Sequence, residues 1–95
     1  MGALRTIRRK VKRGLYELTR HAREEMRADE LCLADIKRVI LFGRLKGKLT
    51  GDPRGIRYVI RGNACDGREV EIICRILPVS GRVRVITVYV KEDET

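Results

Sequence analysis

The stretch REVEIICRILPVSGRVRVITVYV, residues 68–90, decides the fold of this chain. Its first part alternates apolar with polar residues, which is typical of a strand with one buried face. The apolar residues that share this face are Val70, Ile72, Cys74 and Ile76. Residues 82–90 are the most β-prone part of the chain, and PVSG (78–81) is a turn signal between the two runs. The pattern therefore predicts two antiparallel strands that pair with each other.

Two further strands are predicted upstream of this stretch, at RLKGKLT (44–50) and IRYVIRG (56–62). The DPRG tetrapeptide at 52–55 is a strong turn signal between them, and CDG at 65–67 reads as a hairpin turn. The inward face of the second strand is expected to carry Ile56, Tyr58 and Ile60.

The N-terminal half has helical rather than alternating periodicity. Residues 3–13 predict a short basic amphipathic helix that ends at Gly14, because Leu4, Ile7 and Val11 recur at helical spacing. Residues 15–18 alternate weakly and predict a short strand.

Two more helices are predicted after this short strand. Thr19 is the expected N-cap of a helix over 20–29, with Ala22 and Met26 facing inward. The LADIKRVILFG stretch (33–43) predicts the next helix, which ends at Gly43. Its apolar stripe is expected to contain Leu33, Ile36, Val39 and Ile40.

This order of elements predicts the α+β class, with N-terminal helices packed on one face of a twisted antiparallel sheet of four to five strands. The 95 residues leave room for a single domain, 1–95. Its expected parts are a basic helix (1–14), a short strand with two helices (15–43), the antiparallel sheet (44–91) and an acidic tail (92–95).

The chain is strongly basic, with a formal net charge of +9. Such a balance favours polyanionic partners, namely nucleic acid, an acidic protein or a membrane surface, although a GC-rich genome also enriches arginine. Residues 1–23 hold eight Lys or Arg and one acidic residue. The first helix is therefore either an RNA-docking or acidic-partner surface or simply a solvated helix. The residues expected to bind RNA are Arg8, Arg9, Lys10, Lys12, Arg23 and Arg61.

Three cysteines, Cys32, Cys65 and Cys74, lack the C-x-x-C spacing of a zinc site, and one histidine cannot complete a ligand set. We therefore expect no metal, no cofactor and no disulfide, with Cys74 a small core residue. No apolar run approaches the ~20 residues that span a bilayer, and the basic N-terminal stretch lacks the apolar part of a secretory signal. A cytoplasmic location is expected.

The single histidine, His21, falls in the first turn of the helix predicted over 20–29. The helix dipole and the neighbouring Arg20 and Arg23 disfavour a protonated imidazole, so His21 is suited to act as a general base. Glu25 lies one turn further on and could orient the ring. The alternative is a structural histidine that packs against the sheet.

The strand arginines Arg57, Arg61 and Arg75 alternate with apolar residues, so each lies on the polar side of its strand. On neighbouring strands they would form a cationic patch able to hold phosphate. The alternative is a solvated face with cross-strand pairs to Glu69 and Glu71. The strand tyrosines Tyr58 and Tyr89 are candidates for acid chemistry or base stacking, or they are ordinary sheet residues.

Three motifs together resemble a bacterial domain-of-unknown-function family, DUF 4258. They are H-A-R-x-x-M at 21–26, G-x-x-x-D-G at 62–67 and I-T-V-Y at 86–89. The resemblance covers residues 4–91 and implies a small helix-plus-antiparallel-sheet domain similar to RelE-type and BrnT-type toxins. It also implies that the chain is the toxin of a toxin–antitoxin pair, with a cognate antitoxin protein as partner.

The toxins that the family resembles cleave RNA without a metal, through attack of the 2′-hydroxyl on the adjacent phosphate. By that analogy His21 is the general base, Arg57 and Arg75 stabilise charge on the phosphate, and Tyr89 is the candidate acid. Only His21 lies in a motif typical of the family; the other roles follow from strand position.

Three hypotheses about function therefore remain open at the level of the sequence. The first is a metal-independent endoribonuclease, and the second is a non-catalytic module that binds RNA or an acidic protein through its basic helix. The third is a scaffold protein with no role on nucleic acid.

Overall fold

The computed structural model describes residues 2–91 of the chain. Its elements in chain order are α1 (Ala3–Lys12), β1 (Tyr16–Leu18), α2 (Arg20–Ala28), α3 (Leu33–Phe42), β2 (Arg44–Leu49), β3 (Arg57–Asn63), β4 (Glu69–Ile76) and β5 (Val83–Val90). This order confirms the predicted sequence of a helix, a short strand, two helices and four strands. The predicted acidic tail, 92–95, lies outside the described residues.

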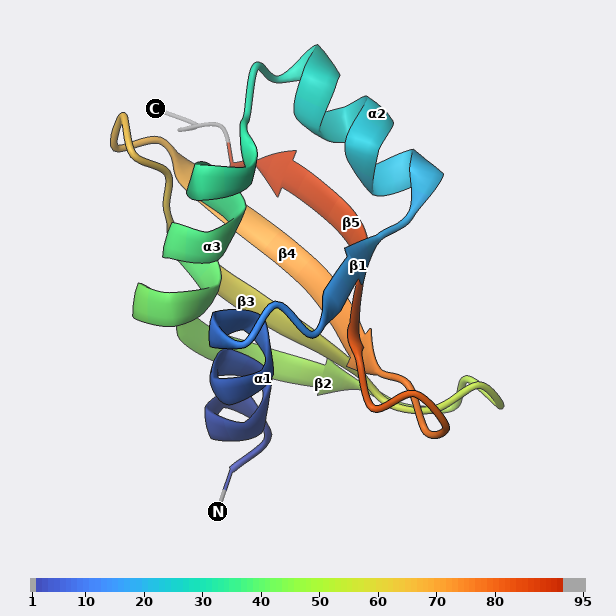
Figure 1. Cartoon of the computed structure of the whole chain (residues 1–95). Helices are drawn as coiled ribbons and strands as arrows, with labels where there is room; N and C mark the ends of the chain where they lie inside the picture. Colours follow the sequence, from blue (N-terminus) through green and yellow to red (C-terminus); the bar gives the residue numbers. More distant parts are fainter. Residues whose placement is uncertain (1, 92–95) are drawn as a thin grey trace.

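The strands form one five-stranded sheet in the order β1-β5-β4-β3-β2 (Figure 1). Strands β2 to β5 pair antiparallel with their neighbours, whereas β1 pairs parallel with β5. The prediction of a wholly antiparallel sheet is therefore wrong at this edge, and the sheet is mixed. The reason is that β1 and β5 are far apart in sequence, so no hairpin fixes their relative direction.

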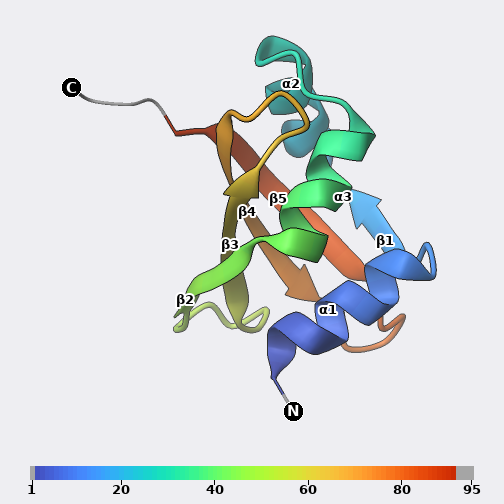
Figure 2. The same ribbon diagram turned by 90° about the vertical axis from the view of Figure 1, so that its left-hand side faces the viewer.

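All three helices lie on one face of the sheet (Figure 1). Figure 2 shows the same arrangement turned by 90°, with α1, α2 and α3 to the right of β2 and β3 and no helix to their left. We call the uncovered side the open face. None of the helices within residues 2–91 has the length and apolar character needed to cross a membrane.

The core lies between the helices and the inward side chains of β3, β4 and β5. Its fully buried members are Ile7, Ala22, Val39, Ile60, Val70, Ile72, Cys74, Val83, Val85 and Val88. Burial raises the pKa of the Cys74 thiol to about 12, which agrees with its predicted role as a core residue. Two predicted core positions are wrong. Leu33, the first residue of α3, is 39% exposed, and Ile56, in the loop before β3, is 42% exposed.

Asp35 joins the start of α3 to the turn between β3 and β4. Its carboxylate accepts hydrogen bonds from the backbone N–H groups of Cys32 and Cys65, each at 2.8 Å. These bonds lower the pKa of Asp35 from 3.8 to about 2 despite the opposing effect of burial. One side chain thereby accepts from two backbone donors in distant parts of the chain.

Two glycines, Gly43 at the end of α3 and Gly62 on β3, let the backbones of these two elements lie in close contact. A Cβ built on Gly43 would lie 2.4 Å from the carbonyl oxygen of Val39 and 2.5 Å from that of Arg61. A Cβ on Gly62 would lie 3.0 Å from the Gly43 Cα. Both positions therefore need glycine because of backbone contact, which gives a physical reason for Gly62 in the G-x-x-x-D-G motif.

We expect Asp35→Ala to lower the free energy of unfolding by about 1–3 kcal/mol, because it leaves two backbone donors unpaired. A carboxyl with a lowered pKa stabilises the fold fully above its ordinary value of 3.8 and loses this effect as the pH falls toward about 2. Urea unfolding at a series of pH values measures the free energy of unfolding of Asp35→Ala and of wild type. The difference between the two should become smaller as the pH falls from 3.8 toward about 2. A difference that does not change with pH, or an equal loss in the surface control Glu24→Ala, would contradict this role.

Gly43→Ala should destabilise the fold by at least about 2 kcal/mol, since its Cβ has no space between two carbonyl groups. The matched control is Gly47→Ala on β2, where a Cβ would meet nothing within 4 Å. Thermal unfolding of both variants measures the difference. Equal melting temperatures for the two variants would show that the contact between α3 and β3 is not tight.

Candidate functional site

The open face of the sheet carries most of the charged strand residues. Because β4 pairs with both β3 and β5, side chains from these three strands form rows across the face. One row contains Arg61, Glu71 and Tyr89, and another contains Arg75 and Arg84 with Glu17 of β1. The two rows are separated by four residues along β4, about 13 Å. The predicted site residues on the strands therefore fall into two clusters.

Four arginines converge on one small cavity at the second row, and we call it the arginine pocket. It has a volume of about 160 Å³. Its lining residues are Thr19, Arg54, Arg57, Arg75, Arg84 and Ile86. Three adjacent strands and the loop between β2 and β3 supply the arginines, so their convergence depends on the tertiary fold.

A β-bulge in β5 shapes one wall of the arginine pocket. The register between β4 and β5 shifts after Ile73, so that Ile73 pairs with Thr87 and Cys74 with Val85. Ile86 is the additional residue at this bulge, and it lines the pocket. The hydroxyl of Thr19 donates to the carbonyl of Ile86 at 3.1 Å and accepts from the N–H of Ala22 at 3.1 Å. The same residue thus caps α2, as predicted, and fixes the start of α2 beside the pocket.

Asp52 in the β2–β3 loop holds three of the four arginines. Its carboxylate lies 3.2 Å from the Arg75 guanidinium, 3.2 Å from the Arg54 Nε and 3.7 Å from the Arg57 Nε. Hydrogen bonds from the backbone and then the side chain of Arg54, together with the charges of Arg54 and Arg75, hold the pKa of Asp52 far below its usual range. Asp52 remains ionised and orients these guanidinium groups.

The arginine pocket has more donors than the protein satisfies. The Arg75 side chain is only 8% exposed, yet its buried Nε has no hydrogen-bond partner, and the same is true of the Nε of Arg57. Arg84 pairs with Glu17 at 2.9 Å, so the four arginines face two carboxylates. Buried donors without partners cost free energy. The pocket therefore has the charge and the unused donors to bind an anion such as a phosphate group.

His21 lies in the first turn of α2, two residues after Thr19, but it does not line the arginine pocket. Its side chain is 64% exposed, and its Nε2 lies 3.3 Å from the Glu25 Oε1. The same Glu25 oxygen accepts the backbone N–H of Val88 at 2.9 Å, which fixes the carboxylate against the edge of β5. The predicted contact between His21 and Glu25 is present, and it leaves the ring largely exposed to solvent.

Tyr89 belongs to the other cluster on the open face. Its hydroxyl donates a hydrogen bond to the buried carboxylate of Glu71, which also accepts from Arg61 at 2.7 and 2.9 Å. The bond to Glu71 and burial raise the pKa of Tyr89 to about 12. The structure does not bring Tyr89 to Arg57 and Arg75. Arg61 forms the cross-strand pair that was the alternative to a cationic patch.

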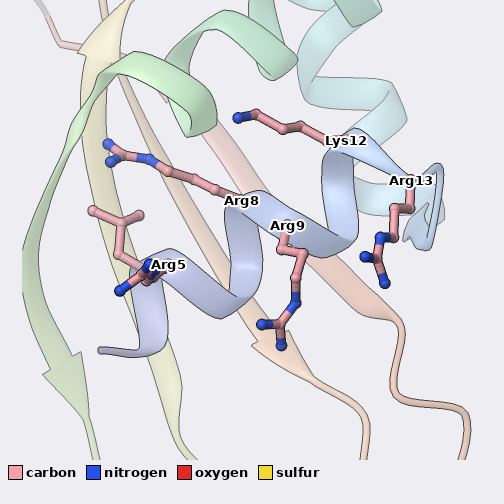
Figure 3. A pocket seen from close by; sticks show the side chains of 6 residues that line it. Arg5, Arg8, Arg9, Lys12 and Arg13 are labelled. Atoms are coloured by element: carbon pink, nitrogen blue, oxygen red, sulfur yellow. The ribbon is translucent and has the colours of Figure 1, made fainter. Parts of the chain in front are cut away.

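The basic helix α1 presents a separate surface (Figure 3). A broad depression of about 790 Å³ lies along it. Its lining residues are Leu4, Arg5, Arg8, Arg9, Lys12 and Arg13. Arg8 is turned toward the end of α3, where its guanidinium donates to the carbonyls of Ile40, at 2.9 Å, and Gly43. This contact joins α1 to the end of α3, while Arg8 also lines the depression, so its role in RNA binding stays a prediction.

The other residues predicted to bind RNA differ in exposure. Arg9 and Lys12 on α1 are exposed, Lys10 is half-buried, and Arg23 is exposed on α2. No ion pair among the described residues involves these four side chains. Arg9, Lys10 and Lys12 are therefore available to a polyanion along α1, which lies on the helix-covered side of the sheet (Figure 2). None of these residues lines the arginine pocket.

Sequence reasoning missed Arg54, Arg84 and Asp52 as parts of the site. Arg54 and Asp52 lie in the DPRG turn, which was interpreted only as a turn, and Arg84 alternates with Val83 and Val85 on β5. The alternation could have placed Arg84 on the polar side of its strand. Nothing local to the sequence indicates that the turn folds back onto Arg75.

The family model described as "Domain of unknown function (DUF4258)" matches residues 18–90. The chain belongs to this family. The match includes His21, Thr19 and every arginine of the arginine pocket, whereas α1 precedes it. The site on the open face is thus part of the DUF4258 domain. No curated protein and no solved structure matches the chain. Among residues 2–91 no three His, Cys, Asp or Glu side chains are placed to hold a metal ion together.

Inorganic phosphate should stabilise the wild-type protein by binding in the arginine pocket. At about ten times its Kd it adds about 1.4 kcal/mol to the free energy of unfolding, which is several degrees in Tm for a domain of this size. The variant Arg57→Gln/Arg75→Gln should lose the shift, and Arg9→Gln/Arg13→Gln, with the same change in charge, should keep it. Sodium chloride at matched ionic strength is the control. The same phosphate shift in all three proteins would place the anion elsewhere.

Proposed function

We propose that this chain is a metal-independent endoribonuclease, the toxin of a toxin–antitoxin pair, and that it holds an RNA phosphate in the arginine pocket. The observation that carries the proposal is the pair of buried guanidinium Nε atoms, on Arg57 and Arg75, that lack partners in a pocket whose lining includes Thr19, two residues before His21. The helix-and-sheet architecture is compatible with the RelE-type and BrnT-type toxins that the sequence resembles. Fold likeness alone would not carry an activity.

The proposed chemistry is transfer of the phosphate to the neighbouring 2′-hydroxyl. His21 removes the 2′-hydroxyl proton, the 2′-oxygen bonds to phosphorus, and the bond to the 5′-oxygen breaks. The leaving oxygen takes its proton from water, and the products are a 2′,3′-cyclic phosphate and a 5′-hydroxyl. Arginines around the phosphate stabilise the additional negative charge that develops in the transition state.

Glu25 supports the proposed base in a specific way. If the His21 Nε2–H donates to Glu25, 3.3 Å away, Nδ1 becomes the unprotonated nitrogen that can accept a proton. Glu25 is itself held by the Val88 N–H, so the ring has a fixed partner. Tyr89 has no part in this mechanism, because its hydroxyl is bound to Glu71 in the other cluster.

The second candidate function is a non-catalytic module that binds RNA or an acidic protein. The depression along α1, with its exposed Arg9, Lys12 and Arg13, favours it because these side chains form no ion pair among the described residues. Such a module would bind RNA with a steep salt dependence and release it uncleaved.

The proposal of a toxin also requires a cognate antitoxin protein as partner. This antitoxin would inhibit the toxin by covering the open face.

Cleavage of labelled single-stranded RNA in the presence of EDTA tests the first proposal. We expect wild type to cleave, and His21→Ala to be at least about 100-fold slower, as for the loss of a general base. Arg57→Gln/Arg75→Gln should be slower by a similar factor because it removes charge stabilisation. Arg27→Gln, in the last turn of α2 and outside the pocket, is the matched control and should cleave normally. Induction in a bacterial host should arrest growth and shorten a reporter mRNA with wild type only.

Two results would contradict the proposal in different ways. Full activity of His21→Ala would remove the histidine from the mechanism. Salt-dependent binding without cleavage by wild type would favour the binding module, and loss of this binding in Arg9→Gln/Lys12→Gln would place it on α1.

A further inference from the structure

Phe42, the single phenylalanine of the chain, is 77% exposed at the last position of α3. An aromatic ring left in water at the end of a helix gives up the free energy of burial that its neighbours Val39 and Ile40 gain. The guanidinium of Arg38, one turn earlier, lies 5.7 Å from the ring centre. This cation–π contact fixes the ring in orientation while much of its surface stays accessible.

A small polar cavity of about 190 Å³ adjoins this ring. Its lining includes Phe42, Arg44, Arg61, Asn63 and Glu69, with Gly43 and Gly62 as a wall without side chains. The cavity is smaller than the ~300 Å³ at which sites for drug-sized ligands begin. It presents guanidinium, amide and carboxylate groups beside an aromatic ring. This combination suits one flat heterocycle with hydrogen-bonding edges, namely a nucleobase.

The cavity and the arginine pocket lie at opposite ends of the open face. Arg57 lines the arginine pocket and Arg61 lines the cavity, four residues apart on β3 and on the same side of the strand, which is about 13 Å. Between them the face contains half-buried Val59, Ile73 and Thr87, which carry no charge. An extended strand of a few nucleotides can reach from one end to the other.

We propose that Phe42 stacks on a base of the RNA whose phosphate occupies the arginine pocket, so that the substrate is single-stranded. This rests on the proposed function in that it assumes an RNA ligand. A base within a duplex is stacked on both faces and paired at its edge, so it cannot reach an isolated ring. An unpaired base can, and stacking on an aromatic side chain tolerates any base.

The test is fluorescence anisotropy with a short single-stranded 2′-O-methyl RNA, which cannot undergo attack by a 2′-hydroxyl. Phe42→Leu should weaken binding about tenfold, as expected for the loss of one stacked base. Phe42→Tyr, which keeps a ring, should bind like wild type. Leu33→Ala, at the other end of α3, is the control for loss of an exposed apolar side chain. An abasic strand of equal length should bind wild type and Phe42→Leu equally, and a duplex should bind more weakly than the single strand.

Unchanged affinity of Phe42→Leu for the single strand would overturn the inference. If Phe42→Leu binds normally but Arg57→Gln/Arg75→Gln loses binding in the same assay, only the stacking role of Phe42 is wrong and the proposed function stands. If the wild type binds no RNA, both the stacking role and the proposed function are wrong. A wild-type dimer in sedimentation that Phe42→Leu abolishes, with unchanged RNA affinity, would assign the ring to contact between two copies and would also overturn the inference.

Discussion

The antiparallel pairing of β4 with β5 determines both faces of the sheet. On one face it aligns Val70, Ile72 and Cys74 with the valines of β5, and the three helices pack on this apolar surface. On the other face the same register places Arg75 beside Arg84. The bulge in β5, between the pairs Ile73–Thr87 and Cys74–Val85, places Ile86 in the pocket wall. The core and the candidate site are therefore two consequences of one strand register.

The arginine pocket is costly for the fold in the absence of an anion. Arg75 is buried with an unpartnered Nε, and Asp52 is the carboxylate that it shares with Arg54 and Arg57. Replacement of such a group by an apolar residue of similar volume is often neutral or stabilising. A cluster of this kind is easier to explain as a site that an anion completes than as a source of stability. The cluster around Glu71 is different, because Arg61 and Tyr89 satisfy its carboxylate within the protein.

Much of the fold could be predicted because its signals are local. The Thr19 cap, the end of α3 at Gly43 and the inward apolar residues of β4 each depend on residues close in sequence, and all are confirmed. The features that the sequence did not predict come from contacts between distant segments. The parallel pairing of β1, the turn of Arg8 toward α3 and the separation of Tyr89 from Arg75 depend on how distant segments meet. The same holds for Asp52, which reaches Arg75 only after the β2–β3 loop folds over the sheet.

The central claim is that the arginine pocket is where this DUF4258 domain holds an RNA phosphate. A crystal structure of the protein with a short 2′-O-methyl RNA tests it most directly, because the electron-dense phosphorus atoms mark each phosphate. We expect one phosphate among Arg57, Arg75 and Arg84, with its neighbouring ribose beside His21. RNA bound only along α1, with the arginine pocket unchanged, would contradict the claim.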